Sequence, residues 1–272
     1  MERILQQIRS NDPTLETLDL YYKQLQPADG VAIAGALEGN TTLTSLNLAA
    51  NRFRNVGGVA IACALDRNTT VTELQFSSNA VGDNFGLAVA RMLERNTTLT
   101  YLDIAVNGLA DVGGTAIANA VETNTTLTSL DLSFNRLEEG FGLAIARTLE
   151  RNTTLTQLIL NNNQLGEDAG EAVANALETN TTLISLTLDD SGLGEVGGAA
   201  FAAALETNTT LTSLDLNDNN VQPETMQRIK ELLDARDPPP PPPSVPFKVK
   251  AAVAPIPRGV KRKSSELQLL LL

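Results

Sequence analysis

The chain has 272 residues, of which 42% are hydrophobic and 4% aromatic, and its net charge is −12. It has no histidine, which removes the usual general base and the commonest metal ligand, and one cysteine, which excludes an intrachain disulfide. No apolar run approaches the ~20 residues that span a membrane, so composition favours a protein that is not an enzyme and has no cofactor, metal or membrane chemistry.

The first ten residues predict a short helix that caps whatever follows. Residues 2–9 place Ile4 and Ile8 on one face of this helix. The segment lacks an apolar stretch of signal-peptide length. We therefore expect a capping segment over residues 1–10, in a cytoplasmic or nuclear protein.

A strict period of 28 residues organises the chain from there on. An asparagine opens the same phrase, NTTL or NTTV, at seven positions: Asn40, Asn68, Asn96, Asn124, Asn152, Asn180 and Asn208. We call these the end-of-helix asparagines. Such a period predicts a solenoid in which each unit packs on its neighbours. Eight units align on their first apolar residue: Leu15, Leu43, Val71, Leu99, Leu127, Leu155, Leu183 and Leu211.

Each unit reads as a short strand, a turn and a helix. In residues 45–49, alternation predicts that Leu46 and Leu48 point inward and that the residues between and beside them point outward. In the helical half, glycine and alanine recur every 28 residues at the registers of Gly58 and Ala62, which lets the helices lie close together. We expect Cys63, within this alanine-rich helix, to be a small buried residue.

The NTT phrase also creates seven Asn-x-Thr sequons. Their register favours a structural role over glycosylation, because an asparagine just past a helix can adopt the left-handed conformation that ends it. We therefore expect the end-of-helix asparagines to be left-handed.

The last helical segment begins at Pro223, and its apolar residues Met226, Ile229, Leu232 and Leu233 predict a cover for the final unit. After Asp237 the composition changes to six consecutive prolines, Pro238–Pro243, and then to a basic segment. Residues 238–272 carry six basic groups and one acidic group, a net +5, which leaves −17 for the other residues. We predict a leucine-rich repeat domain over residues 11–237 and a disordered, proline-rich and basic tail over residues 238–272.

The tail has two open interpretations. Its polyproline run is either a docking site for a polyproline-binding domain or a spacer. Lys261–Lys263 is similar to a nuclear localisation cluster.

The repeated unit N-T-T-L-T-S-L-x-L-x-x-N, followed by G-x-A-I-A-x-A-L, resembles the ribonuclease-inhibitor-like class of leucine-rich repeats over roughly residues 11–237. That class includes ribonuclease inhibitor, the Ran GTPase-activating protein, tropomodulins and the repeat domains of NOD-like receptors. The resemblance implies an α/β horseshoe of about eight units, with a parallel sheet inside and helices outside. It also implies that a second set, the turn asparagines, satisfies backbone groups: Asn51, Asn79, Asn107, Asn135, Asn163 and Asn219.

The outward strand positions are the best candidates for a partner-binding surface. We predict that this concave face binds through Tyr21, Glu73, Tyr101, Asp103, Asp131, Ile159, Asp189 and Asp215. Neighbouring strands about 4.8 Å apart would join Tyr101, Asp103, Asp131 and Ile159 into one patch. The alternative is a solvated sheet face whose residues vary by chance.

These observations predict a non-enzymatic scaffold whose acidic concave face binds a basic or mixed-charge protein. An acidic solenoid is unsuited to nucleic acid, whose binding depends on Lys and Arg. One alternative is a GTPase regulator similar to the Ran GTPase-activating protein, with Arg52, Arg54 and Arg136 at the expected rim. Another is an actin-associated protein, because leucine-rich repeats followed by polyproline resemble leiomodin and tropomodulin relatives. A secreted effector or a receptor fragment also stays open.

Overall fold

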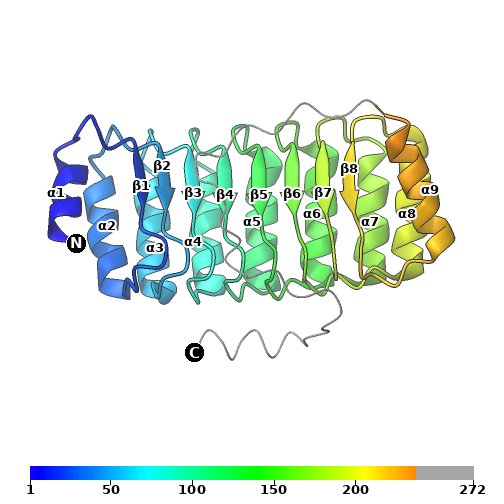
Figure 1. Cartoon of the computed structure of the whole chain (residues 1–272), viewed down its shortest axis with the longest axis horizontal. Helices are drawn as coiled ribbons and strands as arrows, with labels where there is room; N and C mark the ends of the chain where they lie inside the picture. The colour runs from blue at the N-terminus through cyan, green and yellow to red at the C-terminus, as the bar shows by residue number, and fades with distance from the viewer. Residues whose placement is uncertain (237–272) are drawn as a thin grey trace. The chain divides into compact units, whose positions relative to one another are not determined.

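The computed structural model describes residues 1–236, in which strands and helices alternate strictly (Figure 1). The strands are β1 (Thr17–Asp19), β2 (Ser45–Asn47), β3 (Glu73–Gln75), β4 (Tyr101–Asp103), β5 (Ser129–Asp131), β6 (Gln157–Ile159), β7 (Ser185–Thr187) and β8 (Ser213–Asp215). The helices are α1 (Glu2–Arg9), α2 (Pro27–Leu37), α3 (Arg54–Leu65), α4 (Asp83–Leu93), α5 (Asp111–Thr123), α6 (Glu139–Arg151), α7 (Gly166–Leu177), α8 (Gly194–Thr207) and α9 (Pro223–Asp234).

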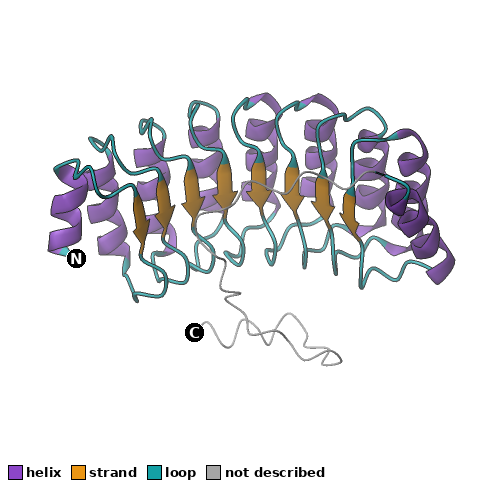
Figure 2. Cartoon of the chain, turned by 45° about the horizontal axis from the view of Figure 1, so that its top comes forward, coloured by secondary structure: helices purple, strands orange, loops and turns teal. Residues whose placement is uncertain are grey.

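The strands form one parallel sheet in sequential order, and the helices lie side by side behind it (Figure 2). Every strand pairs with the residues 28 positions later, so that Leu18 lies beside Leu46 and Leu46 beside Leu74. This arrangement confirms the predicted leucine-rich repeat solenoid. We call the sheet face turned away from the helices the concave face.

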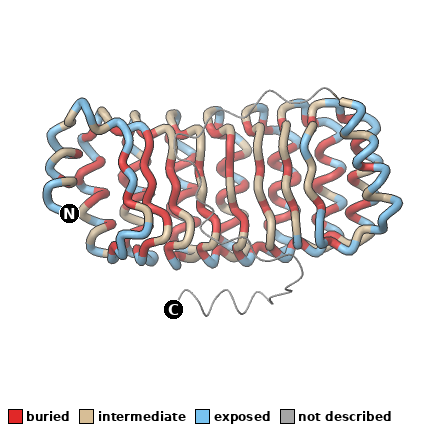
Figure 3. The backbone as a smooth tube through the Cα atoms, in the orientation of Figure 1, coloured by how far each residue is buried: buried red, intermediate tan, exposed pale blue. Residues whose placement is uncertain are grey.

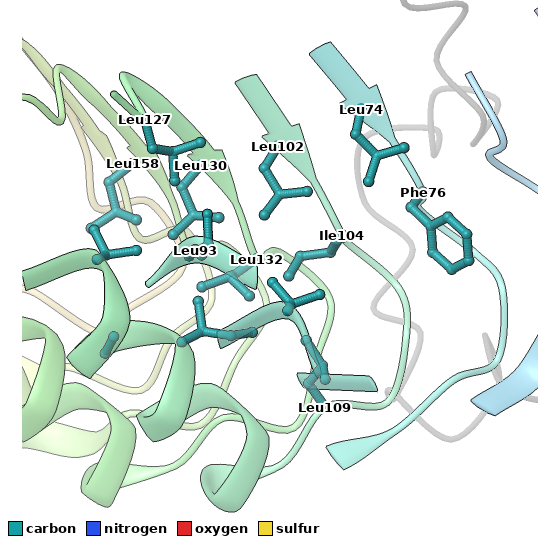
Figure 4. Packing of buried hydrophobic residues seen from close by; sticks show 14 of the residues in the cluster. Leu74, Phe76, Leu93, Leu102, Ile104, Leu109, Leu127, Leu130, Leu132 and Leu158 are labelled. Atoms are coloured by element: carbon teal, nitrogen blue, oxygen red, sulfur yellow. The ribbon is translucent and has the colours of Figure 1, made fainter. Parts of the chain in front are cut away.

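The core lies between the sheet and the helices, as the predicted alternation requires. The middle residue of each strand from β1 to β7 points into it and is buried. Figure 4 shows Leu102, Leu130 and Leu158 from three successive strands in one row. Ile33 and its equivalents supply the helical side of the same cluster, and Figure 3 shows the buried stripe running through all units.

The end-of-helix asparagines form a hydrogen-bonded ladder between units. The Asn68 Nδ2 donates to the carbonyls of Leu37 and Asn40 at 3.1 Å, and its Oδ1 accepts from the amide of Val71 at 2.8 Å. The predicted left-handed conformation is wrong, since Asn124 has φ −70° and ψ 133°. The side chain, and not the backbone conformation, satisfies the groups at the helix end.

The turn asparagines act as the resemblance implied. The Asn51 Nδ2 donates to the carbonyls of Leu20 and Leu48 at 2.9 Å, and its Oδ1 accepts from the amides of Lys23 and Leu25 at 3.0 Å. Each such asparagine therefore pairs the turn of its own unit with that of the unit before.

Close packing between helices explains one recurrent glycine. A Cβ added to Gly86 of α4 would lie 2.7 Å from the Cα of Gly113 in α5. The row of Cys63 faces the other way, and the cysteine itself is exposed. Our prediction that Cys63 is buried is wrong, because it lies on the outer side of α3 between the buried Ala62 and Ala64.

The two ends of the solenoid are covered differently. At the first end, α1 buries Leu5 and Ile8 against the core, which confirms the predicted helix. At the other end α9 buries Ile229, whereas Met226 and Leu233 are only partly buried. The predicted cover of the final unit is therefore incomplete within residues 1–236.

The helices of residues 1–236 are short, and none has the length and hydropathy of a membrane span. The predicted tail, its polyproline run and its basic cluster lie outside the described residues.

Candidate functional site

The predicted site residues fall into three places on the concave face. The strand register puts Glu73 beside Tyr101, Asp103 beside Asp131, and Asp131 beside Ile159. We call these five residues, from β3 to β6, the central patch. The other three predicted residues lie nearer the two ends of the sheet.

Asp103 and Asp131 are direct neighbours on β4 and β5. The Asp103 Oδ1 accepts from the amide of Ala105 at 3.0 Å, and its Oδ2 accepts from the Ser77 hydroxyl at 2.8 Å. Burial, followed by the charge of Asp131, raises the pKa of Asp103 to about 7. The two hydrogen bonds oppose this shift but do not cancel it.

Asp131 has a similar environment. Its Oδ1 accepts from the Ser133 hydroxyl at 2.6 Å and from the Ser133 amide at 2.8 Å. Burial nevertheless raises the pKa of Asp131 above its ordinary value. Near neutral pH the pair therefore resists carrying two full negative charges, because like charges on adjacent strands repel each other.

Tyr101 borders the carboxylate pair on β4. Its ring is partly buried. Burial, and then the charges of Asp103, Asp131 and Glu73, raise the pKa of the Tyr101 phenol. The hydroxyl thus stays protonated, and the patch presents an aromatic ring, an apolar side chain and three acids.

No basic side chain forms an ion pair with Asp103 or Asp131 in the part of the chain that the structure describes. The ion pairs of that part lie in the helices or directly after them, as in Arg151–Glu122 and Arg228–Glu206. Within residues 1–236, no three His, Cys, Asp or Glu side chains are placed to hold a metal ion. The geometry of the patch suits a hydrogen-bond donor or an organic cation.

Asp189 and Asp215 belong to a second group near the end of the sheet. Burial, and then the charges of Asp215, Asp218 and Asp190, raise the pKa of Asp189 to about 6. The Asp189 Oδ1 is buried without a hydrogen-bond partner among the described residues. We call these four residues the C-terminal acidic group.

Tyr21 lies apart from both groups, at the end of β1. Its ring centroid is 6.2 Å from that of Tyr22, which is 68% exposed. The structure thus divides the eight predicted residues into one central patch, one acidic group and one isolated tyrosine.

The concave face is less open than the sequence analysis assumed. Ser45, Asn47 and Ala49, which we expected on a solvated face, are all buried. The Ser45 hydroxyl donates to Glu73 at 2.9 Å, and the Asn47 Oδ1 accepts from the Ala49 amide at 3.0 Å. Short polar side chains here fold back onto their neighbours.

Three contributors to these groups were missed. Ser77 and Ser133 hold the paired carboxylates, and Asp218 adds charge beside Asp189. Their positions follow from the 28-residue register, because each lies directly after a strand. The signal was therefore present, but the side-chain hydrogen bonds were not.

Two family models match the chain. Residues 1–105 match the model described as TMOD/LMOD Leucine-rich domain. Residues 95–118, 123–138, 151–174 and 207–229 match the model described as Leucine Rich repeat. No curated protein matches the chain.

Solved structures show a loose likeness. One is named Leiomodin-1 Actin-Binding Site 2; it is 18% identical, the match covers 86% of this chain and 87% of that chain, and the TM-score is 0.30. Another is the tropomodulin C-terminal domain of Caenorhabditis elegans, which is 11% identical, with 86% and 90% covered and a TM-score of 0.36. Superpositions this loose carry no inference about the present chain.

Proposed function

Because the chain is a leucine-rich repeat protein, we propose that it is a non-enzymatic scaffold whose central patch binds a basic or mixed-charge segment of a protein partner. The observation that carries the proposal is the pair Asp103 and Asp131, which lies on adjacent strands without a basic partner in residues 1–236.

A Lys or Arg side chain from a partner would supply what this pair lacks. Its positive charge would favour ionisation of both carboxylates and reverse their mutual repulsion. Tyr101 beside the pair offers a ring face to the same cation, and Ile159 offers apolar contact to its methylene groups. Electrostatic complementarity of this kind controls on-rate and specificity more than affinity.

Affinity capture from lysate tests the proposal with three baits: the whole chain, residues 1–237 and residues 238–272. Each bait is used at low and at moderate salt. The proposal expects a partner that stays with residues 1–237 and is lost as salt rises, because the contact is electrostatic. A partner that follows residues 238–272 instead would contradict it.

Matched variants then place the contact. Tyr101→Ala with Asp131→Lys should lose the partner while the far-ultraviolet circular dichroism spectrum stays unchanged. Tyr22→Ala with Asp168→Lys removes an exposed tyrosine and reverses a charge on the outer side of α7, and it should retain the partner. Equal capture by both double variants would overturn the proposal.

A second candidate function is association with actin. It is favoured by the match of residues 1–105 to the TMOD/LMOD Leucine-rich domain, and it suits the cytoplasmic location predicted from the sequence. Sedimentation of the whole chain with actin filaments tests it. Cosedimentation above a control with bovine serum albumin would support it, and equal amounts in the pellet would dispose of it.

The GTPase-regulator alternative stays a prediction from the sequence. A turnover assay over a small panel of GTPases tests it, and the absence of stimulation would remove it.

A further inference from the structure

The outer edge of β8 is the one place in residues 1–236 where the repeat pattern stops without a successor. Elsewhere each unit pairs with the next through its strand and through its turn asparagine. We propose that this edge is a second binding site, which takes an extended peptide of a protein partner with the pattern Leu-x-Leu-x-x-Asn.

Backbone groups at this edge are aligned for a further parallel strand. In the preceding unit, the carbonyl of Ile184 accepts from the amides of Thr212 and Ser213, and the amide of Leu188 donates to the carbonyl of Asp215 at 2.8 Å. The equivalent groups one unit later are the Thr212 carbonyl and the Leu216 amide. No described residue lies beside them to form the next strand. An added strand would supply the missing donor and acceptor.

The turn of the last unit has a matching requirement. The Asn219 Oδ1 accepts from the amides of Ser191 and Leu193 at 2.9 and 3.1 Å. The equivalent amides one unit later belong to Asn219 and Val221, and no asparagine of residues 1–236 follows to accept from them. An asparagine three residues after the second leucine of a bound strand would accept both hydrogen bonds.

An apolar groove lies beside the same edge. Leu214, Met226 and Leu233 are only partly buried there, although the residues equivalent to Leu214 in the other strands are at most 7% exposed. Together with Ile229 and Lys230 they line a groove of about 610 Å³ between β8 and α9. The leucines of a bound Leu-x-Leu segment would continue the core into this groove.

A second copy of the chain is a poor occupant. To add its β1 to β8, the copy would bring its own α1 along, in the helix layer directly before α2. The place beside β8 in that layer is already filled by α9, which packs on α8. A single extended segment avoids this clash, and the proposal therefore commits to a peptide.

The test uses the full chain and a labelled synthetic peptide with the sequence of residues 125–135, TTLTSLDLSFN. In the solenoid this segment already makes the proposed contacts. The Ser129 amide donates to the Thr100 carbonyl at 3.0 Å, and the Asn135 Oδ1 accepts from the amides of Asn107 and Leu109 at 3.1 Å. Fluorescence anisotropy measures its affinity.

Backbone methylation of the peptide identifies the edge that binds. An N-methyl group at the position of Ser129 blocks the donor that faces β8 and should weaken binding at least about tenfold. An N-methyl group at the position of Leu132 blocks the amide of the opposite edge and should change affinity less than about threefold. Alanine at the position of Asn135 should weaken binding about tenfold.

Protein variants locate the groove. Met226→Lys should weaken binding about tenfold, whereas Val112→Lys, on the exposed side of α5, should leave it unchanged. Tyr101→Ala with Asp131→Lys should also leave it unchanged, so that failure here is distinct from failure of the central patch. The proposal is overturned if the parent peptide does not bind, if both N-methyl peptides bind equally, or if sedimentation velocity shows self-association that Met226→Lys abolishes.

Discussion

The guanidinium of Arg236 donates to the carbonyl of Asn208 at 2.6 Å. It also donates to the carbonyl of Leu205 at 2.7 Å and to that of Leu211. Asn208 makes the same pair of contacts one unit earlier, with the carbonyls of Leu177 and Asn180. Arg236 thus takes the place of an end-of-helix asparagine and completes the ladder at the last unit.

Removal of this contact should loosen the last unit. We expect Arg236→Ala to lower the free energy of unfolding by about 1–3 kcal/mol, because three buried carbonyls lose a charged donor. Arg228→Ala is the control, since its ion pair with Glu206 is exposed and should contribute less than about 1 kcal/mol. Urea unfolding measures both, and equal losses would contradict the assigned role.

The raised pKa values of Asp103 and Asp131 predict a pH dependence of stability. A carboxyl whose folded pKa lies above its unfolded value stabilises the protein below the unfolded pKa, and this contribution is lost as pH rises through the folded pKa. For Asp103 that window runs from about 4 to about 7. We expect the free energy of unfolding to fall across it.

Asp103→Asn should remove most of this fall and stabilise the protein by about 1–2 kcal/mol at pH 8. The amide can still accept from Ser77 and Ala105. Asp168→Asn on α7 is the matched control and should leave the pH profile unchanged. A profile that stays the same in Asp103→Asn would show that the pair does not titrate as described.

Helix packing predicts opposite effects for two glycine substitutions. Gly86→Ala should destabilise the protein by more than about 2 kcal/mol, because its Cβ would lie 2.7 Å from the backbone of Gly113. Gly35→Ala on α2 meets nothing within 4 Å and should stabilise by about 0.5–1 kcal/mol. Thermal unfolding of the two variants measures the contrast, and a shared sign would refute it.

The left-handed residue after each strand offers a stabilising change. Val106 has φ 55°, a conformation that a β-branched residue adopts at a cost, whereas its equivalent Asn162 has the same φ at little cost. Val106→Asn should therefore stabilise by about 1 kcal/mol, and Asn162→Val should destabilise by a similar amount. Chemical denaturation checks the pair; no stabilisation by Val106→Asn would be the contrary result.

Much of this architecture follows from the 28-residue period, because one unit in register fixes the strand, turn and helix of the other seven. The period does not report chemistry. Arg236 stands 28 residues after Asn208, yet an arginine is unlike an asparagine and gave no reason to expect the same contacts. Cys63 shares its register with the exposed residues Arg91 and Arg147, a comparison that would have corrected our expectation of burial.

The site was predicted in its membership more than in its physics. The register places Asp103 beside Asp131, and the sequence analysis grouped them for that reason. It could not give their burial, the serine hydroxyls that hold them or the resulting pKa shifts, because these depend on side-chain rotamers and on the neighbouring strands. For the same reason the buried Ser45 and Asn47 were expected on an open surface.

Site-specific photocrosslinking tests the central claim most directly. A photoreactive phenylalanine analogue is placed at position 101 in the central patch, and at position 112 on the exposed side of α5 as the control. Our account predicts that the protein captured with residues 1–237 crosslinks from position 101 and not from position 112, and that crosslinking falls as salt rises. Crosslinking of the same partner from position 112 alone would contradict it.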